Sequence, residues 1–361
     1  MPRTSLENVG SEGHWLKRPR QSCRLFGESE SDSGEDLDRR VSTMVRKLNK
    51  NDRELVTFLA EYRMLAVSQI AALCNVGKPA ARNRVGKLTN AELAKERTPA
   101  FTNGPGRPER WVSLAERGID WLRTDGALGR SVPSNHVAAD GIRCVEHLLA
   151  INWFRLHLVH LERTFPRLSV TFLSSTSPFL ERGSDGQPLV SDRAPAADAG
   201  GEPVPFTPDG VFTLRDQESG KTLLFFLEVD MGTETLASAR RGAKDILTKV
   251  ISYQQYFRSG GYKRYQDLWD CELKGFRLLF LAHSAARLAA LSRLVQETSP
   301  SDFIWLTDRD RMFADGVSAD IWARGGKLDA PPDSIVGQTM SCVTPLPARH
   351  RQEPAEHKSH A

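Results

Sequence analysis

The chain has 361 residues, of which 40% are hydrophobic and 26% are charged, so it can bury one large core or two smaller ones. No apolar stretch reaches the roughly 18 residues of a membrane span, and residues 1–20 lack the apolar segment of a secretory signal. The five cysteines include no Cys-x-x-Cys pair, which argues against a disulfide framework or a zinc ribbon and favours a cytoplasmic protein. A net charge of +4 is too small to identify a nucleic-acid-binding protein, so such a signal must come from charge placement.

Composition divides the chain into two tails and two blocks. The start is acidic and rich in Ser and Gly, and the end is rich in Pro, His and Arg without periodicity, so both are predicted to be disordered. The acidic tail either solvates the chain or shields a basic surface. The predicted units are an acidic tail at 1–50, a winged helix-turn-helix at 51–123, a linker at 124–134, an α/β domain at 135–310 with an insertion at 174–208, and a tail at 330–361.

The first block predicts the three helices of a helix-turn-helix. Asn51 can cap a first helix, and a second short helix is expected over 67–73. Gly77 then provides the turn into a third helix, about 78–93, in which Pro79 fits the first turn. Segments on either side of a Gly- and Pro-rich loop follow this helix, and they predict a β-wing.

Charge gathers on the third helix and the wing. Residues 78–110 hold eight Lys and Arg against three Glu. The apolar Ala81, Val85 and Leu88 fall on one side of the helix, so the polar side is free to contact phosphates and base edges. The alternative is a winged helix used for protein contact. The residues predicted to bind double-stranded DNA are Lys78, Arg82, Asn83, Lys87, Arg107 and Arg110.

The second block alternates helices and strands, and its carboxylates gather at one hairpin. Glu228 and Asp230 lie two residues apart on a predicted strand, so both side chains leave the same face. Folding the hairpin about residue 218 places Asp209 opposite residue 227 or 228. Three carboxylates this close would repel unless a cation or a proton neutralised them. Such oxygen ligands suit Mg²⁺ or Mn²⁺, which Asp209 and Glu228 would hold.

These motifs resemble two related groups of proteins. Pro208-Asp209 followed by Phe226–Asp230 resembles the PD-(D/E)xK nuclease superfamily, whose domain has a restriction-endonuclease-like fold. More closely, the chain is similar to the replication-relaxation family of plasmid and mobile-element proteins, which joins a winged helix to such a domain. The segments that carry this similarity are 147–152, 208–209, 228–233 and 249–253, with Tyr256.

The resemblance implies a mixed α/β fold and a role in plasmid replication or in DNA relaxation and mobilisation, beside a relaxase or a replication initiator. One position departs from the nuclease pattern, because Asp230 stands where the superfamily usually has a lysine. Lys249 on the following helix is the candidate replacement, which makes Asp209, Glu228, Asp230 and Lys249 the catalytic candidates. Three interpretations remain open: a DNA-binding protein that keeps the fold alone, a metal-dependent endonuclease, and a transcriptional regulator.

Overall fold

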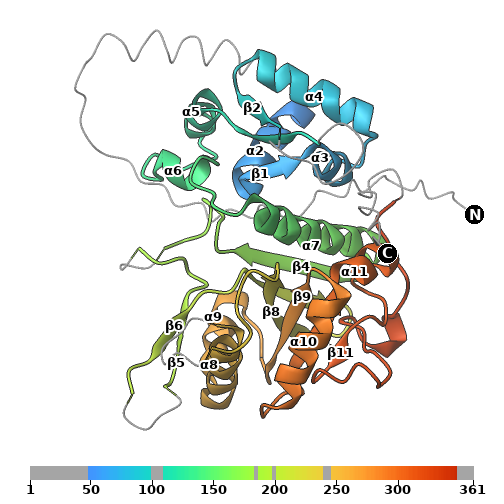
Figure 1. The fold of residues 1–361 in the computed structure, drawn as a ribbon. Coiled ribbons are helices and arrows are strands. Elements are labelled where there is room, and N and C mark those ends of the chain that lie inside the picture. The colour runs from blue at the N-terminus through green and yellow to red at the C-terminus, as the bar shows by residue number, and fades with distance from the viewer. Residues whose placement is uncertain (1–47, 99–108, 183–185, 197–200, 239–244, 348–361) are drawn as a thin grey trace, which may run out of the picture.

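The computed structural model is a mixed α/β chain in which two units share a central helix, α7 (Figure 1). It describes residues 48–98, 109–182, 186–196, 201–238 and 245–347. Most of the two predicted tails lies outside these ranges, as does the loop of the predicted wing, which includes Arg107. No helix in these ranges combines the length and the apolar composition that crossing a bilayer requires.

The N-terminal unit consists of helices packed against a three-stranded antiparallel sheet with the order β1-β3-β2. This is the element order expected of a winged helix-turn-helix. Its elements are α2 (Lys50–Tyr62), β1 (Met64–Ala66), α3 (Val67–Leu73), α4 (Lys78–Asn90), β2 (Ala94–Arg97), β3 (Trp111–Leu114) and α5 (Glu116–Thr124).

Local signals set the helix starts in this unit. The cap of α2 is Asn49, whose side chain accepts a hydrogen bond from the backbone N–H of Asp52, and not Asn51 as the sequence suggested. The helix begins one residue before Asn51, which places that residue inside the first turn. Gly77 precedes α4 as expected, and Pro79 lies in the first turn of that helix.

A six-stranded mixed sheet forms the second unit, with the order β11-β10-β9-β8-β7-β4. Strands β8, β9 and β10 are parallel, whereas β4, β7 and β8 are joined as antiparallel neighbours. The strands are β4 (Leu168–Ser174), β7 (Gly210–Asp216), β8 (Thr222–Asp230), β9 (Phe276–Ala282), β10 (Ile304–Asp308) and β11 (Ala323–Arg324).

Helices cover both faces of this sheet (Figure 1). Alternation along β8 sends Phe225 and Leu227 into the core under α7, and Phe226 into the core on the other face. Each face is therefore sealed by its own apolar layer. The covering helices are α7 (Val145–Thr164) on one face and α8 (Ile246–Ser259), α9 (Arg264–Trp269) and α10 (Ala285–Gln296) on the other.

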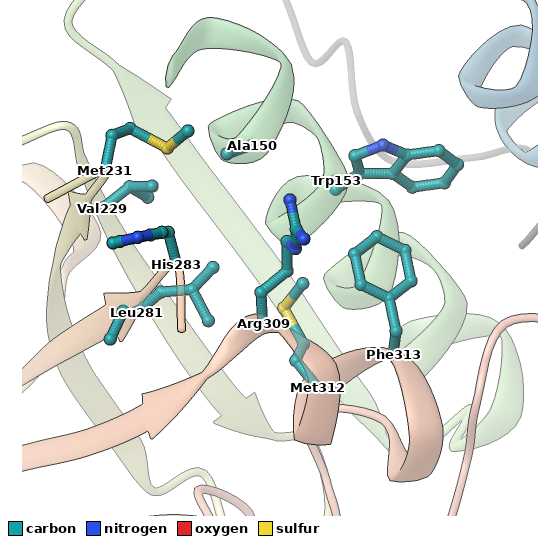
Figure 2. A pocket seen from close by; sticks show the side chains of 10 residues that line it. Ala150, Trp153, Val229, Met231, Leu281, His283, Arg309, Met312 and Phe313 are labelled. Carbon is teal, nitrogen blue, oxygen red and sulfur yellow. The ribbon is translucent and has the colours of Figure 1, made fainter. Parts of the chain in front are cut away.

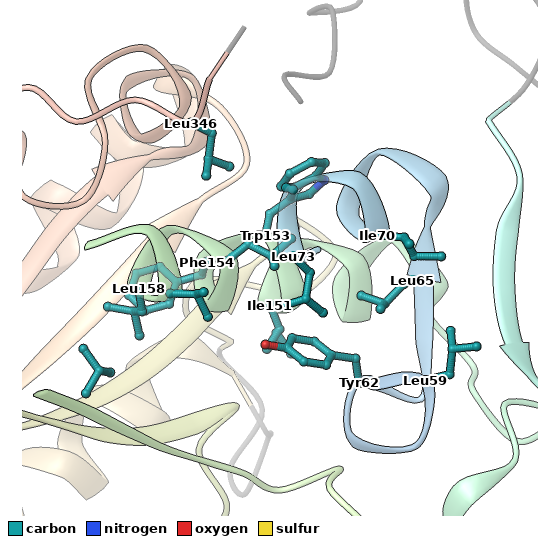
Figure 3. Packing of buried hydrophobic residues seen from close by; sticks show 14 of the residues in the cluster. Leu59, Tyr62, Leu65, Ile70, Leu73, Ile151, Trp153, Phe154, Leu158 and Leu346 are labelled. Carbon is teal, nitrogen blue, oxygen red and sulfur yellow. The ribbon is translucent and has the colours of Figure 1, made fainter. Parts of the chain in front are cut away.

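Helix α7 belongs to both units because it is buried on opposite sides. Figure 3 shows its Ile151 and Phe154 in the same cluster as Tyr62 and Leu73 of the N-terminal unit. Buried polar groups add direct links: Gln69 Nε2 donates to the carbonyl of Leu149 at 2.8 Å. The predicted linker at 124–134 therefore does not separate two independent cores.

Further links run from the middle of α7 to the end of α2. Asn152 Nδ2 donates to the carbonyls of Met64 and Tyr62 at 2.8 and 3.2 Å. Arg155 pairs with Glu61 at 2.6 Å, and its guanidinium lies 3.9 Å from the centre of the Tyr62 ring. These contacts fix the orientation of the N-terminal unit on the sheet.

Two loop-rich segments pack more closely than their composition suggested. Residues 330–347 were predicted to be disordered, but Ile335 is fully buried and Thr344 N donates to the carbonyl of Asp315 at 2.7 Å. Their few apolar residues lack periodicity, so the sequence does not reveal this packing.

The predicted insertion at 174–208 contains a two-stranded ribbon, β5 (Asp192–Ala194) and β6 (Val204–Phe206), that lies against α8. Buried Asp192 accepts hydrogen bonds from Tyr265 at 3.1 Å and pairs with Arg264 at 2.6 Å, which anchors the ribbon on α9. Its last residue, Phe206, places its ring 4.8 Å from that of Tyr253. The ribbon therefore forms a wall over α8.

We expect Gln69→Met to destabilise the protein by about 2 kcal/mol. The change keeps the side-chain volume but removes the bond to Leu149 O and the 3.0 Å bond that Gln69 accepts from Ala66 N, both of them buried. The measurement is the free energy of unfolding in urea. Gln217→Met on the exposed hairpin turn is the control and should leave stability unchanged; an equal effect of the two substitutions would contradict this account.

Candidate functional site

Asp209 lies one residue before β7 and faces the end of β8. Pairing of Gly210 with Leu227, together with a 3.1 Å bond from Asp209 N to the carbonyl of Leu227, places Asp209 opposite Glu228. This is one of the two registers that the hairpin fold predicted. Asp209 Oδ2 accepts hydrogen bonds from the backbone N–H of Val229 at 2.8 Å and from His147 Nε2 at 3.1 Å.

Glu228 is 4% exposed and is held by two side chains of α8. Its Oε2 accepts from Lys249 Nζ at 2.9 Å, and its Oε1 accepts from the Tyr253 hydroxyl at 2.6 Å. Lys249 and Tyr253 are four residues apart, so one face of α8 presents both. The structure thus brings Lys249 to the predicted carboxylates, and Glu234 approaches the same amino group at 3.3 Å.

Asp230 leaves the same face of β8 as Glu228 but has a different partner. Arg287 of α10 pairs with its carboxylate through Nε and, at 3.3 Å, through Nη2. Gly232 N also donates to its Oδ1 at 2.9 Å. Asp209, Glu228 and Asp230 therefore each contact a separate basic side chain, which is His147, Lys249 and Arg287 respectively.

Burial and charge shift the pKa values in this cluster. Burial, reinforced by nearby Asp209 and opposed by Lys249, raises the pKa of Glu228 to about 7. Burial also works against the charge on Lys249, but the attraction of Glu228 and Glu234 outweighs it and raises the pKa of that lysine. The pKa of His147 is also raised. Burial lowers it, but the hydrogen bond to Asp209 and the negative charge of Asp209 together outweigh burial.

The predicted Mg²⁺ or Mn²⁺ would be held by Asp209 and Glu228, which face each other across the hairpin. In the described part of the chain, no group of three or more His, Cys, Asp or Glu side chains is placed to hold a metal ion. Both oxygens of Glu228 and both oxygens of Asp230 already accept hydrogen bonds from the protein. A cation held by Asp209 and Glu228 would compete with Lys249 for the charge of Glu228, whereas Arg287 pairs with Asp230.

Sequence reasoning named Asp209, Glu228, Asp230 and Lys249 as candidates, placed His147 only in the family-like segment 147–152, and missed Arg287. The sequence signal for Arg287 was its position, since it is a basic residue shortly after a parallel strand. The carboxyl ends of parallel strands share one edge of a sheet, so the helix after β9 begins close to Asp230 at the end of β8.

The same edge carries a shallow apolar pocket on the α7 side of the sheet (Figure 2). Trp153 of α7 and Phe313 of α11 (Arg309–Asp315) form one wall, with ring centres 5.2 Å apart. His283 and Arg309 supply its polar side chains (Figure 2). Its lining offers mainly van der Waals contact.

The polar face of α4 is open to solvent. The side chains of Arg82, Asn83 and Lys87 are exposed and make no hydrogen bond or ion pair with the described residues. Those of Ala81 and Val85 are buried. Lys78 at the start of the helix is half-buried. Figure 1 shows α4 on the side of the N-terminal unit that faces away from α7.

The basic residues of the β2–β3 hairpin are paired. Arg110, a predicted DNA-binding residue, forms an ion pair with Glu96 at 2.6 Å. Lys95 and Arg97 both pair with Asp140. In the described part of this unit, Arg82 and Lys87 of α4 are exposed and form no ion pair, and the sixth predicted residue, Arg107, falls outside the described ranges.

Comparison with known families identifies the chain. A model of the replication-relaxation family matches residues 56–270, which include α4, the hairpin carboxylates and Lys249. The protein belongs to the replication-relaxation family. A search of curated proteins found no match.

Solved structures show little overall likeness to this replication-relaxation protein. RV1404 from Mycobacterium tuberculosis is 17% identical with a TM-score of 0.22, and the match covers 29% of this chain and 77% of RV1404. NadR in complex with 4-hydroxyphenylacetate is 16% identical with a TM-score of 0.21, and the match covers 30% of this chain and 77% of NadR.

We expect Glu228→Gln to flatten the pH dependence of stability between pH 4.5 and 7. The folded protein holds a proton on Glu228 up to a pKa of about 7, above the ordinary value of 4.5, so the unfolded state loses its proton first as the pH rises. The wild type therefore loses up to about 3 kcal/mol of unfolding free energy across this range, and the raised pKa of His147 acts in the same direction above pH 6.5.

The measurement is urea unfolding at several pH values. Asp216→Asn is the matched control. Arg167 lowers the pKa of Asp216 to about 2, so this carboxylate changes the pH dependence of stability only below about pH 4. Equal slopes in wild type and Glu228→Gln would show that Glu228 is ionised throughout.

Proposed function

We propose that this protein binds duplex DNA through α4 and acts in the replication, or in the relaxation and mobilisation, of plasmid or mobile-element DNA. The observation that carries the proposal is the row of unpaired polar and basic side chains on α4, Arg82, Asn83 and Lys87, above a buried apolar face. Positive side chains that lack a partner can release counterions from phosphates at no cost in broken ion pairs. Membership of the replication-relaxation family supports DNA as the partner.

The second unit serves this function as a scaffold. Helix α7 fixes the N-terminal unit through Gln69, Asn152 and Arg155, so α4 projects from a rigid base. A relaxase or a replication initiator is the partner that we infer beside it on the DNA. Lys249 and Tyr253 already engage both oxygens of Glu228, one of the two predicted metal ligands, and this supports DNA binding without cleavage.

We expect Arg82→Ala combined with Lys87→Ala to weaken duplex binding about tenfold or more and to reduce the salt slope by roughly two, because two phosphate contacts are lost. The measurement is a gel-shift titration at several salt concentrations. Lys263→Ala combined with Lys274→Ala removes the same charge from exposed positions on the α8 and α9 side and should leave binding unchanged. Equal effects of the two double variants, or none from either, would favour the alternative in which α4 contacts protein.

We expect purified protein to leave supercoiled plasmid intact in the presence of Mg²⁺ or Mn²⁺, because the oxygens of Glu228 and Asp230 are already occupied. The measurement is the conversion of supercoiled to open-circular plasmid on an agarose gel. Glu228→Ala serves as the matched control for contamination. Nicking that depends on the metal and disappears in this variant would establish the endonuclease in place of the proposed function.

A further inference from the structure

Gly86 lies near the middle of α4, where no packing contact inside the protein requires a glycine. Glycine is the poorest helix former after proline, so a glycine at a helix centre weakens the helix. A Cβ built at Gly86 would meet no atom within 4 Å. Gly118 in α5 differs, because a Cβ there would lie 2.2 Å from the carbonyl oxygen of Leu93. The fold excludes a side chain at Gly118 but accepts one at Gly86.

Gly86 lies in a strip with two asparagines. Helical spacing places Asn83, Gly86 and Asn90 along one line of α4, nearly opposite the buried Val85 and Leu88. Asn83 and Asn90 are exposed and have no partner among the described residues. A neutral strip thus runs along the exposed face, and each of its two asparagine amides offers both a hydrogen-bond donor and an acceptor.

Basic side chains flank this strip. Arg82 lies on one side of the Asn83–Gly86–Asn90 line and Lys87 on the other, and both are exposed. Positive charge at the edges with amides at the centre matches the major groove of duplex DNA, where phosphates border the base edges.

We infer that Asn83, Gly86 and Asn90 form the base-reading strip of α4, with the asparagines reading adenines and Gly86 letting the helix backbone approach the base edges. This inference rests on the proposed DNA binding. Asparagine is well suited to adenine, because its side-chain oxygen accepts a hydrogen bond from the N6 amino group and its side-chain NH2 donates one to N7. Asn83 and Asn90 are about 10 Å apart along the helix axis, which corresponds to about three base steps.

The first test is selection of duplexes from a randomised library by the full-length protein. The expected result is a preference for adenine at two positions about three base pairs apart. Asn83→Ala should relax the preference at one position and Asn90→Ala at the other, each by about tenfold. Selected sites whose base preferences survive both substitutions would overturn the assignment of the asparagines.

The second test separates the role of Gly86 from protein stability. Gly86→Ala should raise the thermal midpoint, since alanine favours the helix and meets no neighbour. Gly86→Gln should fold normally by circular dichroism but bind the selected duplex about tenfold or more weakly, because its side chain holds the helix away from the bases. Ala289→Gln, at an exposed position in α10, is the control and should bind as the wild type does.

The outcomes distinguish this inference from the proposal on which it rests. If Gly86→Gln binds duplex as tightly as the wild type, the base-reading strip is wrong while DNA binding stands. If the wild-type protein binds no duplex at all, DNA binding fails and the strip fails with it.

Discussion

The burial of α7 on two opposite sides is the constraint on which the rest of this structure depends. A helix covered on one side needs a single apolar stripe, but α7 must present apolar groups to the sheet and to the N-terminal unit at once. Among the polar groups of α7 that remain buried, Asn152 Nδ2 and the Arg155 guanidinium find partners on β1 and α2. The two units thus share one core, and the orientation of α4 is fixed relative to the sheet.

The same helix reaches the carboxylate cluster. His147, in the first turn of α7, donates to Asp209 and to the carbonyl of Val229, so the start of α7 is held at the end of the β7–β8 hairpin. In the same cluster, Lys249 pairs with Glu228 and Arg287 pairs with Asp230. Buried acid–base pairs of this kind cost desolvation energy, and they position their neighbours only when every partner is present.

Charge is arranged differently in the N-terminal unit. Lys95, Arg97 and Arg110 are in ion pairs, whereas Arg82 and Lys87 on α4 face solvent without a partner among the described residues. The whole chain carries a net charge of only +4, so composition alone does not reveal this separation. Unpaired charge on one rigid helix is what distinguishes a candidate DNA surface from an evenly solvated one.

The sequence by itself determined the elements whose signals are local. Local patterns located α4 and the strand that carries Glu228 and Asp230, Gly77 marked the turn, and hairpin geometry placed Asp209 opposite residue 227 or 228, because each depends on residues close in the chain. Only the tertiary structure decided the pairing of Asp230 with Arg287, the packing of Ile335, and the merging of two predicted domains through α7. These features join segments far apart in sequence, and no local pattern records which distant side chain a buried charge or apolar group will meet.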